Sequence, residues 1–97
     1  MFRHVVLFRW SATATDEQKA AVVDNLARLP SIIPELRGYR LGADAGLVDG
    51  NWDFAAVADF DDVDGWRTYG ANPEHQQIIA EHIRPIVGER AAVQYEY

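Results

Sequence analysis

Residues 2–10, FRHVVLFRW, decide the fold, because the strand that they predict has apolar residues on both of its faces. The run is rich in β-branched and aromatic side chains, a composition typical of strands. Successive side chains of a strand point to opposite faces. One face therefore carries Phe2, His4, Val6, Phe8 and Trp10, and the other carries Arg3, Val5, Leu7 and Arg9. Because the second face is apolar in its middle, we expect it to be covered, and a second subunit would cover it.

A helix is predicted directly after this strand. Thr15 is placed as its N-cap, with Gln18 at the capping-box position and acidic residues in the first turn. Apolar residues then recur at helical spacing, at Val22, Val23, Leu26 and Leu29. Pro30 is expected to end the helix.

Three further strands are predicted over residues 36–43, 52–60 and 91–97. The glycine- and aspartate-rich sequence between the first two of these is typical of a loop. In the strand over 52–60, Ala55, Ala56 and Ala58 leave room beside the backbone. That room suits either a ligand or a closely packed helix.

Two short helices are predicted before the last strand. Asp61 or Asp62 caps the first, and Gly70 is expected to end it. Asn72 caps the second, with Pro73 at the first helical position, where the missing N–H costs nothing. Pro85 is expected to kink or end the second helix.

The resulting order is β-α-β-β-α-(α)-β, over a single domain that spans residues 1–97. This order predicts an α+β, ferredoxin-like split βαβ fold with a four-stranded antiparallel sheet and helices on one face. A two-fold homodimer would cover the other face by packing sheet on sheet.

Composition excludes several classes of function. The chain has a formal charge of −6 and one lysine, and its arginines are scattered, so we expect no nucleic acid partner. No apolar run approaches the ~20 residues that span a bilayer, and the N-terminus lacks a small-residue cleavage site. We therefore expect no membrane partner and a cytoplasmic location. The three histidines lack metal-ligand spacing, and no calcium or phosphate loop is present, so neither a metal nor a cofactor is expected.

The stretch YGANPEH, residues 69–75, brings a phenol and an imidazole to a helix boundary. His75 is the third residue of the second short helix, where the helix dipole disfavours protonation and favours a neutral imidazole that can act as a base. A protonated Tyr69 can donate a hydrogen bond to a developing oxyanion. Simple packing or ligand contact by the same two residues remains an alternative. His4 either faces a pocket or is a core histidine bonded to the backbone.

The motifs RHVVLFRW, LPSIIPELRGYRLGAD, DFAAVADFDD and YGANPEHQQI followed by RPIV resemble, in this order, the stress-responsive A/B barrel domain (Dabb) family. The resemblance covers nearly the whole chain. It implies a ferredoxin-like protomer, a homodimer whose sheets form an α/β barrel, and no single function. Members of the olivetolic acid cyclase type close a linear polyketide by aldol condensation.

By this resemblance, the site residues of the cyclase type fall on His4, Tyr69, His75 and, near the last strand's end, Glu96. Glu96 would orient the imidazole, with an exposed edge-strand carboxylate as the alternative. A further histidine of the cyclase falls close to Phe54 here, beside Asp53, which leaves the substrate open. We take His75 and Tyr69 as candidate catalytic residues. The candidate substrate-binding residues are His4, Phe54, Trp66 and Glu96, although Trp66 is most simply a core or interface residue.

Three functions fit these residues. The first is a cofactor-independent cyclase or lyase that acts on a small hydrophobic or polyketide-like molecule through Tyr69 and His75. The second is a stress-responsive binding protein without turnover. The third is a cofactor-independent monooxygenase, in which oxygen reacts directly with an activated aromatic substrate.

Overall fold

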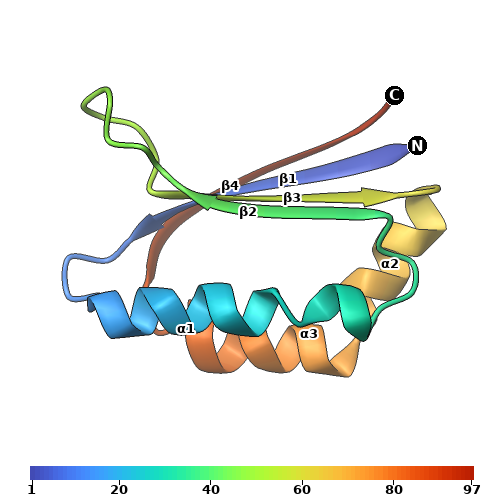
Figure 1. Cartoon of the computed structure of the whole chain (residues 1–97), viewed down its shortest axis with the longest axis horizontal. Coiled ribbons are helices and arrows are strands. Elements are labelled where there is room, and N and C mark those ends of the chain that lie inside the picture. Colours follow the sequence, from blue (N-terminus) through green and yellow to red (C-terminus); the bar gives the residue numbers. More distant parts are fainter.

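The computed structural model describes residues 1–97 and contains one four-stranded antiparallel sheet with helices on one side (Figure 1). The strands are β1 (Phe2–Trp10), β2 (Gly38–Ala43), β3 (Phe54–Phe60) and β4 (Val87–Glu96). The helices are α1 (Asp16–Leu26), α2 (Val63–Ala71) and α3 (Pro73–Ile78), with a 3₁₀ turn over Leu29–Ser31 and a π-helical turn over Ile79–Ile83. The strand order β2-β3-β1-β4 confirms the predicted ferredoxin-like α+β fold.

The first helix begins as predicted and ends earlier. Thr15 and Gln18 form both bonds of the capping box, at 2.9 and 3.1 Å. The helix was expected to reach Leu29, but it ends at Leu26. Pro30 disfavours α-helical backbone at the residue before it, and the chain tightens into the 3₁₀ turn that begins at Leu29.

The two middle strands are shorter than predicted. The strand expected over 36–43 begins at Gly38, and the strand expected over 52–60 begins at Phe54. Asp53 lies outside the β2–β3 ladder: its N–H bonds to the carbonyl of Phe8, and its carboxylate accepts from the N–H of Trp10. These bonds fix the start of β3 against β1.

The boundary between α2 and α3 lies at Asn72. Gly70 was expected to end α2, but this glycine is helical and α2 continues to Ala71. Asn72 adopts an extended backbone with φ −62° and ψ 128°, and its side chain accepts from the N–H of His75 at 3.1 Å. One residue therefore ends the second helix and caps the third.

The last strand begins four residues before its predicted start at residue 91. Pro85 lacks an N–H, and the helix widens into the π-helical turn ahead of it. β4 then pairs with β1 from Val87 onward, across a register shift at Arg9 and Trp10. A side chain at Gly88 would approach the carbonyl oxygen of Arg9 to 3.3 Å, so glycine suits this close pairing.

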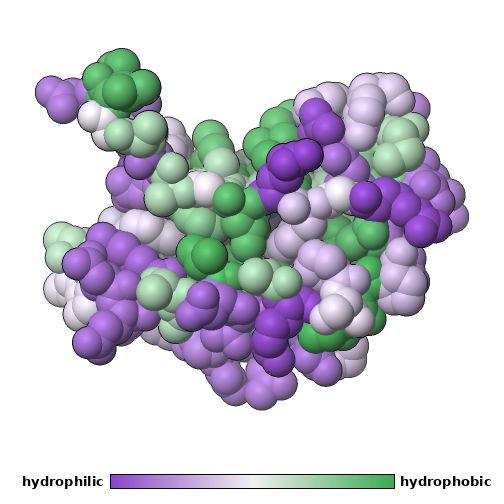
Figure 2. Space-filling model, viewed as in Figure 1, coloured by the Kyte–Doolittle hydropathy of each residue, from purple (hydrophilic) through white to green (hydrophobic).

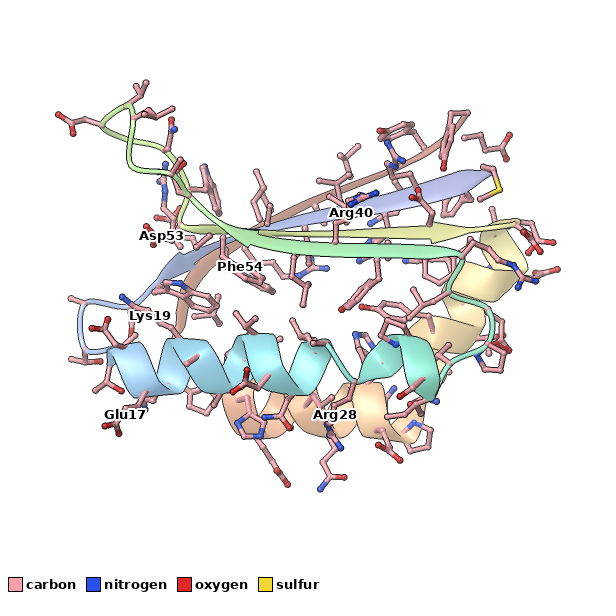
Figure 3. All side chains as sticks on the ribbon, viewed as in Figure 1. Glu17, Lys19, Arg28, Arg40, Asp53 and Phe54 are labelled. Carbon is pink, nitrogen blue, oxygen red and sulfur yellow. The ribbon has the colours of Figure 1, made fainter.

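The sheet has an inner face, which packs on the helices, and an outer face, which nothing covers. Figure 3 shows Phe54 pointing toward the helices and Arg40 pointing away from them. Phe60, Leu29 and Val22 are among the fully buried side chains of the core between sheet and helices.

The middle of the outer face is apolar. One row across the four strands consists of Arg40, Val57, Val5 and Val93, and Val93 is 55% exposed.

None of the helices has both the length and the apolar composition that a membrane span requires.

Candidate functional site

One row of residues across the inner face supplies much of the candidate site. Tyr39, Ala58, His4 and Gln94 are direct register partners on β2, β3, β1 and β4. Residues directly opposite each other in an antiparallel sheet share a face. The row therefore places a phenol, an imidazole and an amide on one face of the sheet, and the small Ala58 separates the phenol from the imidazole.

A cavity of about 100 Å³ lies between this part of the sheet and the helices. We call it the inner cavity. Its apolar lining comes from the sheet, α1 and the π-helical turn, and consists of Val6, Phe8, Leu26, Ala56, Ile79 and Ile83. Its polar lining consists of His4, Tyr39, Tyr69, His75 and Arg90. Of the alanines expected to leave room, Ala56 borders the cavity, while Ala58 is buried in the core.

Tyr69 is in aromatic contact with three other polar residues of the inner cavity. Its ring centroid lies 4.0 Å from His75, 6.2 Å from His4 and 6.4 Å from Tyr39. Its hydroxyl shares a long hydrogen bond of 3.4 Å with the hydroxyl of Tyr39. Burial raises the pKa of both phenols. Both are therefore protonated at neutral pH, and a pair that shares one bond keeps one hydroxyl hydrogen for a ligand.

His75 is held at the start of α3 and is 9% exposed. Burial lowers the pKa of its imidazole, and the backbone groups of Tyr69 and Gly70 offset part of this shift. The direction agrees with the sequence prediction, but burial is the main cause rather than the helix dipole. Its Nδ1 is buried and makes no hydrogen bond. The ring is thus neutral near pH 7.

His4 is the second buried imidazole of the inner cavity, at 8% exposure. Burial lowers its pKa to about 4, assisted by the positive charge of Arg90 and by His75. Its Nδ1 lies 2.8 Å from Nε2 of Gln94. Because that amide nitrogen donates, Nδ1 of His4 accepts and Nε2 carries the ring proton. His4 is therefore a hydrogen-bond donor within the site.

The structure brings three of the sequence-predicted site residues together at the inner cavity, namely His4, Tyr69 and His75. The ring centroid of Trp66 lies 6.0 Å from that of His4, and Trp66 does not line the cavity. Phe54 stacks on Phe8 and is buried outside the cavity.

Glu96 lies elsewhere. It pairs with Phe2 near the chain termini and borders a shallow acidic hollow with Asp61 and Asp62. The imidazole of His75 therefore has no carboxylate from Glu96 to orient it, because β4 carries Glu96 past the cavity to the far end of β1.

Sequence reasoning missed Tyr39, Gln94 and Arg90. The signal for Arg90 was the alternation of β4: residues 90, 92, 94 and 96 share a face once the strand begins before residue 90. Arg90 is the register partner of Phe8, so it lies on the inner face. The late predicted start of this strand hid it.

These features define a class of protein: a ferredoxin-like α+β domain with a cavity that holds two imidazoles and two phenols between its sheet and its helices. The sequence model of one protein family, the stress-responsive A/B barrel domain (Dabb), matches residues 2–97, and the chain belongs to this family. No curated protein is similar enough in sequence to be matched with it.

Solved structures show the same fold. A dimeric ferredoxin-like protein of unknown function from Thermobifida fusca is 47% identical, with 99% of this chain and 90% of that chain covered and a TM-score of 0.92. A dimeric protein of unknown function from Bacteroides fragilis is 27% identical, with 99% and 95% covered and a TM-score of 0.81. The hydroxynitrile lyase of Passiflora edulis is 19% identical, with 97% and 90% covered and a TM-score of 0.84.

Proposed function

We propose that this protein is a homodimeric enzyme of the lyase or cyclase type, which removes a proton next to a carbonyl group of a small molecule bound in the inner cavity. One observation carries the proposal: the neutral imidazole of His75 lies 4.0 Å, ring to ring, from the protonated phenol of Tyr69 beside that cavity. A base and a hydrogen-bond donor on one cavity are the two groups that enolate formation needs.

His75 is proposed as the base. Its lowered pKa keeps the ring able to accept a proton at neutral pH. The carbon–hydrogen bond beside the carbonyl breaks, the proton passes to the imidazole, and the electron pair moves onto the carbonyl oxygen. In the cyclase direction the enolate carbon attacks a second carbonyl and forms a carbon–carbon bond. In the lyase direction such a bond breaks, its electron pair forms the enolate, and the enolate carbon then takes a proton from the imidazolium. Both directions pass through the same enolate.

Tyr69 is proposed to hold the enolate oxygen. Its raised pKa means that it donates a hydrogen bond and does not ionise. Tyr39, which shares the 3.4 Å bond, positions that hydroxyl and polarises it. His4, with its ring proton on Nε2, is a further donor for a substrate oxygen.

The size of the inner cavity limits the substrate. An apolar cavity of ~150 Å³ accepts benzene, and this one holds about 100 Å³. A small carbonyl compound, or only the reacting end of a polyketide-like chain, fits that space. The likeness in fold to a hydroxynitrile lyase supports the view that a lyase can be built on this scaffold.

The homodimer is part of the proposal because the outer face needs a cover. Two relatives with this fold are dimeric. The loop between β2 and β3 projects on the outer side of the sheet, and its tip carries hydrophobic residues beside hydrophilic ones (Figures 1 and 2). Leu47 and Val48 in this loop are 85% and 64% exposed. A second copy against this side would bury them together with Val5, Val57 and Val93 on the outer face of the sheet.

Exchange of carbon-bound hydrogen for deuterium tests the chemistry directly. We expect the protein to accelerate exchange at the methylene group of acetoacetamide in D₂O, measured by proton NMR. His75→Ala should slow the catalysed rate by about 10²- to 10⁴-fold, and Tyr69→Phe by about 10²- to 10³-fold.

His82→Ala is the matched control, because His82 lies outside the inner cavity. It should exchange at the wild-type rate. Exchange at the uncatalysed rate with wild-type protein, or equal rates in wild type and folded His75→Ala, would leave a binding protein without turnover as the better description.

A further inference from the structure

Arg90 is the one exposed residue among those that line the inner cavity, so it marks the cavity's opening. It extends from β4 on the inner face, directly opposite Phe8 of β1. The two arginines of β1 have acidic partners: Arg3 pairs with Asp59 at 2.7 Å, and Arg9 with Glu89 at 3.5 Å. Arg90 forms no such pair within the chain.

The charge of the inner cavity is opposite to that of the protein. The chain carries a formal charge of −6, yet no carboxylate lines the cavity. His4 and His75 are neutral there, and both phenols are protonated. The guanidinium of Arg90 is therefore the single formal charge at the site, and it is positive.

The polar groups of the cavity's interior are neutral. They are the phenols of Tyr39 and Tyr69 and the imidazoles of His4 and His75. The inner part of the site thus offers neutral donors and acceptors, while the opening offers a cation. A ligand that complements both has a neutral carbonyl at one end and an anionic group at the other.

We propose that Arg90 determines the substrate class: the inner cavity takes small carbonyl compounds that bear a carboxylate, with the carboxylate on the guanidinium at the opening and the carbonyl beside the contacting rings of Tyr69 and His75. A guanidinium matches a carboxylate with two parallel hydrogen bonds, which fixes orientation as well as affinity. This inference rests on the proposed function for the position of the carbonyl, and it adds the charge that selects the substrate.

Acetoacetate and acetoacetamide form a matched pair for the test, since they differ in charge and have the same number of non-hydrogen atoms. We expect wild-type protein to bind acetoacetate about tenfold more tightly than acetoacetamide, measured by NMR titration at low ionic strength. Arg90→Gln should remove most of this tenfold preference by weakening acetoacetate alone, because the variant has no charged group to bond to the carboxylate.

Arg90→Lys keeps the charge without the planar fork and should retain part of the preference. Arg84→Gln removes an exposed arginine that does not line the cavity, and it should bind both compounds as wild type does. Thermal unfolding of each variant checks that the fold is intact. Equal affinity of wild type for the two compounds, no binding of acetoacetate, or an unchanged preference in Arg90→Gln would overturn the inference.

The two proposals fail in different ways. If acetoacetamide undergoes exchange that depends on His75 while acetoacetate is not preferred, the acid–base function stands and the role of Arg90 falls. If acetoacetate is preferred through Arg90 and no exchange is catalysed, the anionic ligand class stands and the enzyme function falls.

Discussion

The imidazole of His75 is buried against Tyr69 with a ring nitrogen that makes no hydrogen bond. Burial keeps this ring neutral at pH 7, and a neutral imidazole can accept a proton. Asn72 holds the backbone of this residue and leaves its ring free.

The two buried histidines make stability depend on pH. His4 has a pKa of about 4 in the folded protein against an ordinary value of 6.5, and the pKa of His75 is lowered in the same direction. Between about pH 4 and 6.5 the unfolded chain therefore binds more protons than the folded chain. The stabilising effect of the neutral rings is complete above pH 6.5 and is lost as the pH falls toward 4.

We accordingly expect the free energy of unfolding, measured with urea, to be lower at pH 5 than at pH 7. His4→Gln should reduce this difference, because the variant lacks one of the two groups. Asp59, whose pKa is lowered by its bond to Arg3, loses its charge only below its ordinary value of 3.8, outside this window. Equal stability at pH 5 and pH 7 in the wild-type protein would contradict the neutral, buried state of both rings.

At the level of single residues, the sequence predicted the members of the site that have a distinctive local pattern. Tyr69 and His75 flank a helix boundary, and His4 interrupts an apolar strand face. Tyr39 and Gln94 reach the site only because they are register partners across the sheet. Register between strands that are distant in sequence is set by tertiary packing, which no local pattern reveals.

Asn72 links two elements, and its loss should affect both the fold and the site. Asn72→Ala removes the oxygen that accepts from the N–H of His75, which we expect to cost about 1 kcal/mol of stability and to lower Tm by ~4–8 °C. Because His75 lies in the first turn of α3, deuterium exchange should also slow. Asn72→Ser, which keeps a capping oxygen, should restore most of both.

Thr15→Ala is the matched control for this prediction. It removes the corresponding cap of α1, whose side chain bonds to the N–H of Gln18 at 3.1 Å. We expect a similar loss of stability, measured by thermal unfolding, with no change in the exchange rate. A normal exchange rate in Asn72→Ala would show that the cap of α3 does not position the imidazole.

The elements themselves were largely predictable, and their ends were not. β1 and the caps of α1 and α3 follow from alternation and capping residues that lie within the sequence of each element, while the cap of α2, predicted as Asp61 or Asp62, is Asp62. The end of α2 was placed at Gly70 because glycine often ends helices, yet here the backbone stays helical and Asn72 makes the turn. β4 began late in the prediction because Gly88 and Glu89 are poor strand formers that pair here because β1 lies beside them.

At the scale of the whole molecule, the outer face of the sheet has an apolar middle that no other part of the single chain covers. We expect the protein to sediment as a dimer. Val57→Lys places a charge beside Val5 in the apolar middle of this face, and burying an unpaired charge in an interface is unfavourable. The variant should shift toward monomer in analytical ultracentrifugation.

Val23→Lys is the matched control, because Val23 is an exposed valine on α1, away from the sheet's outer face. It should remain dimeric. If wild-type protein sediments as a monomer, or if Val57→Lys remains as dimeric as wild type, the outer face is not the dimer interface.

The central claim is that a cavity on the inner face presents neutral imidazoles to a small carbonyl ligand. Histidine-selective ¹⁵N NMR tests it most directly, because the chain has three histidines and only His4 and His75 line the cavity. At pH 7 we expect both of these rings to be neutral, and addition of acetoacetate should shift their signals and leave that of His82 in place. A positively charged His75 at pH 7, or signals from His4 and His75 that do not respond to the ligand, would contradict the account.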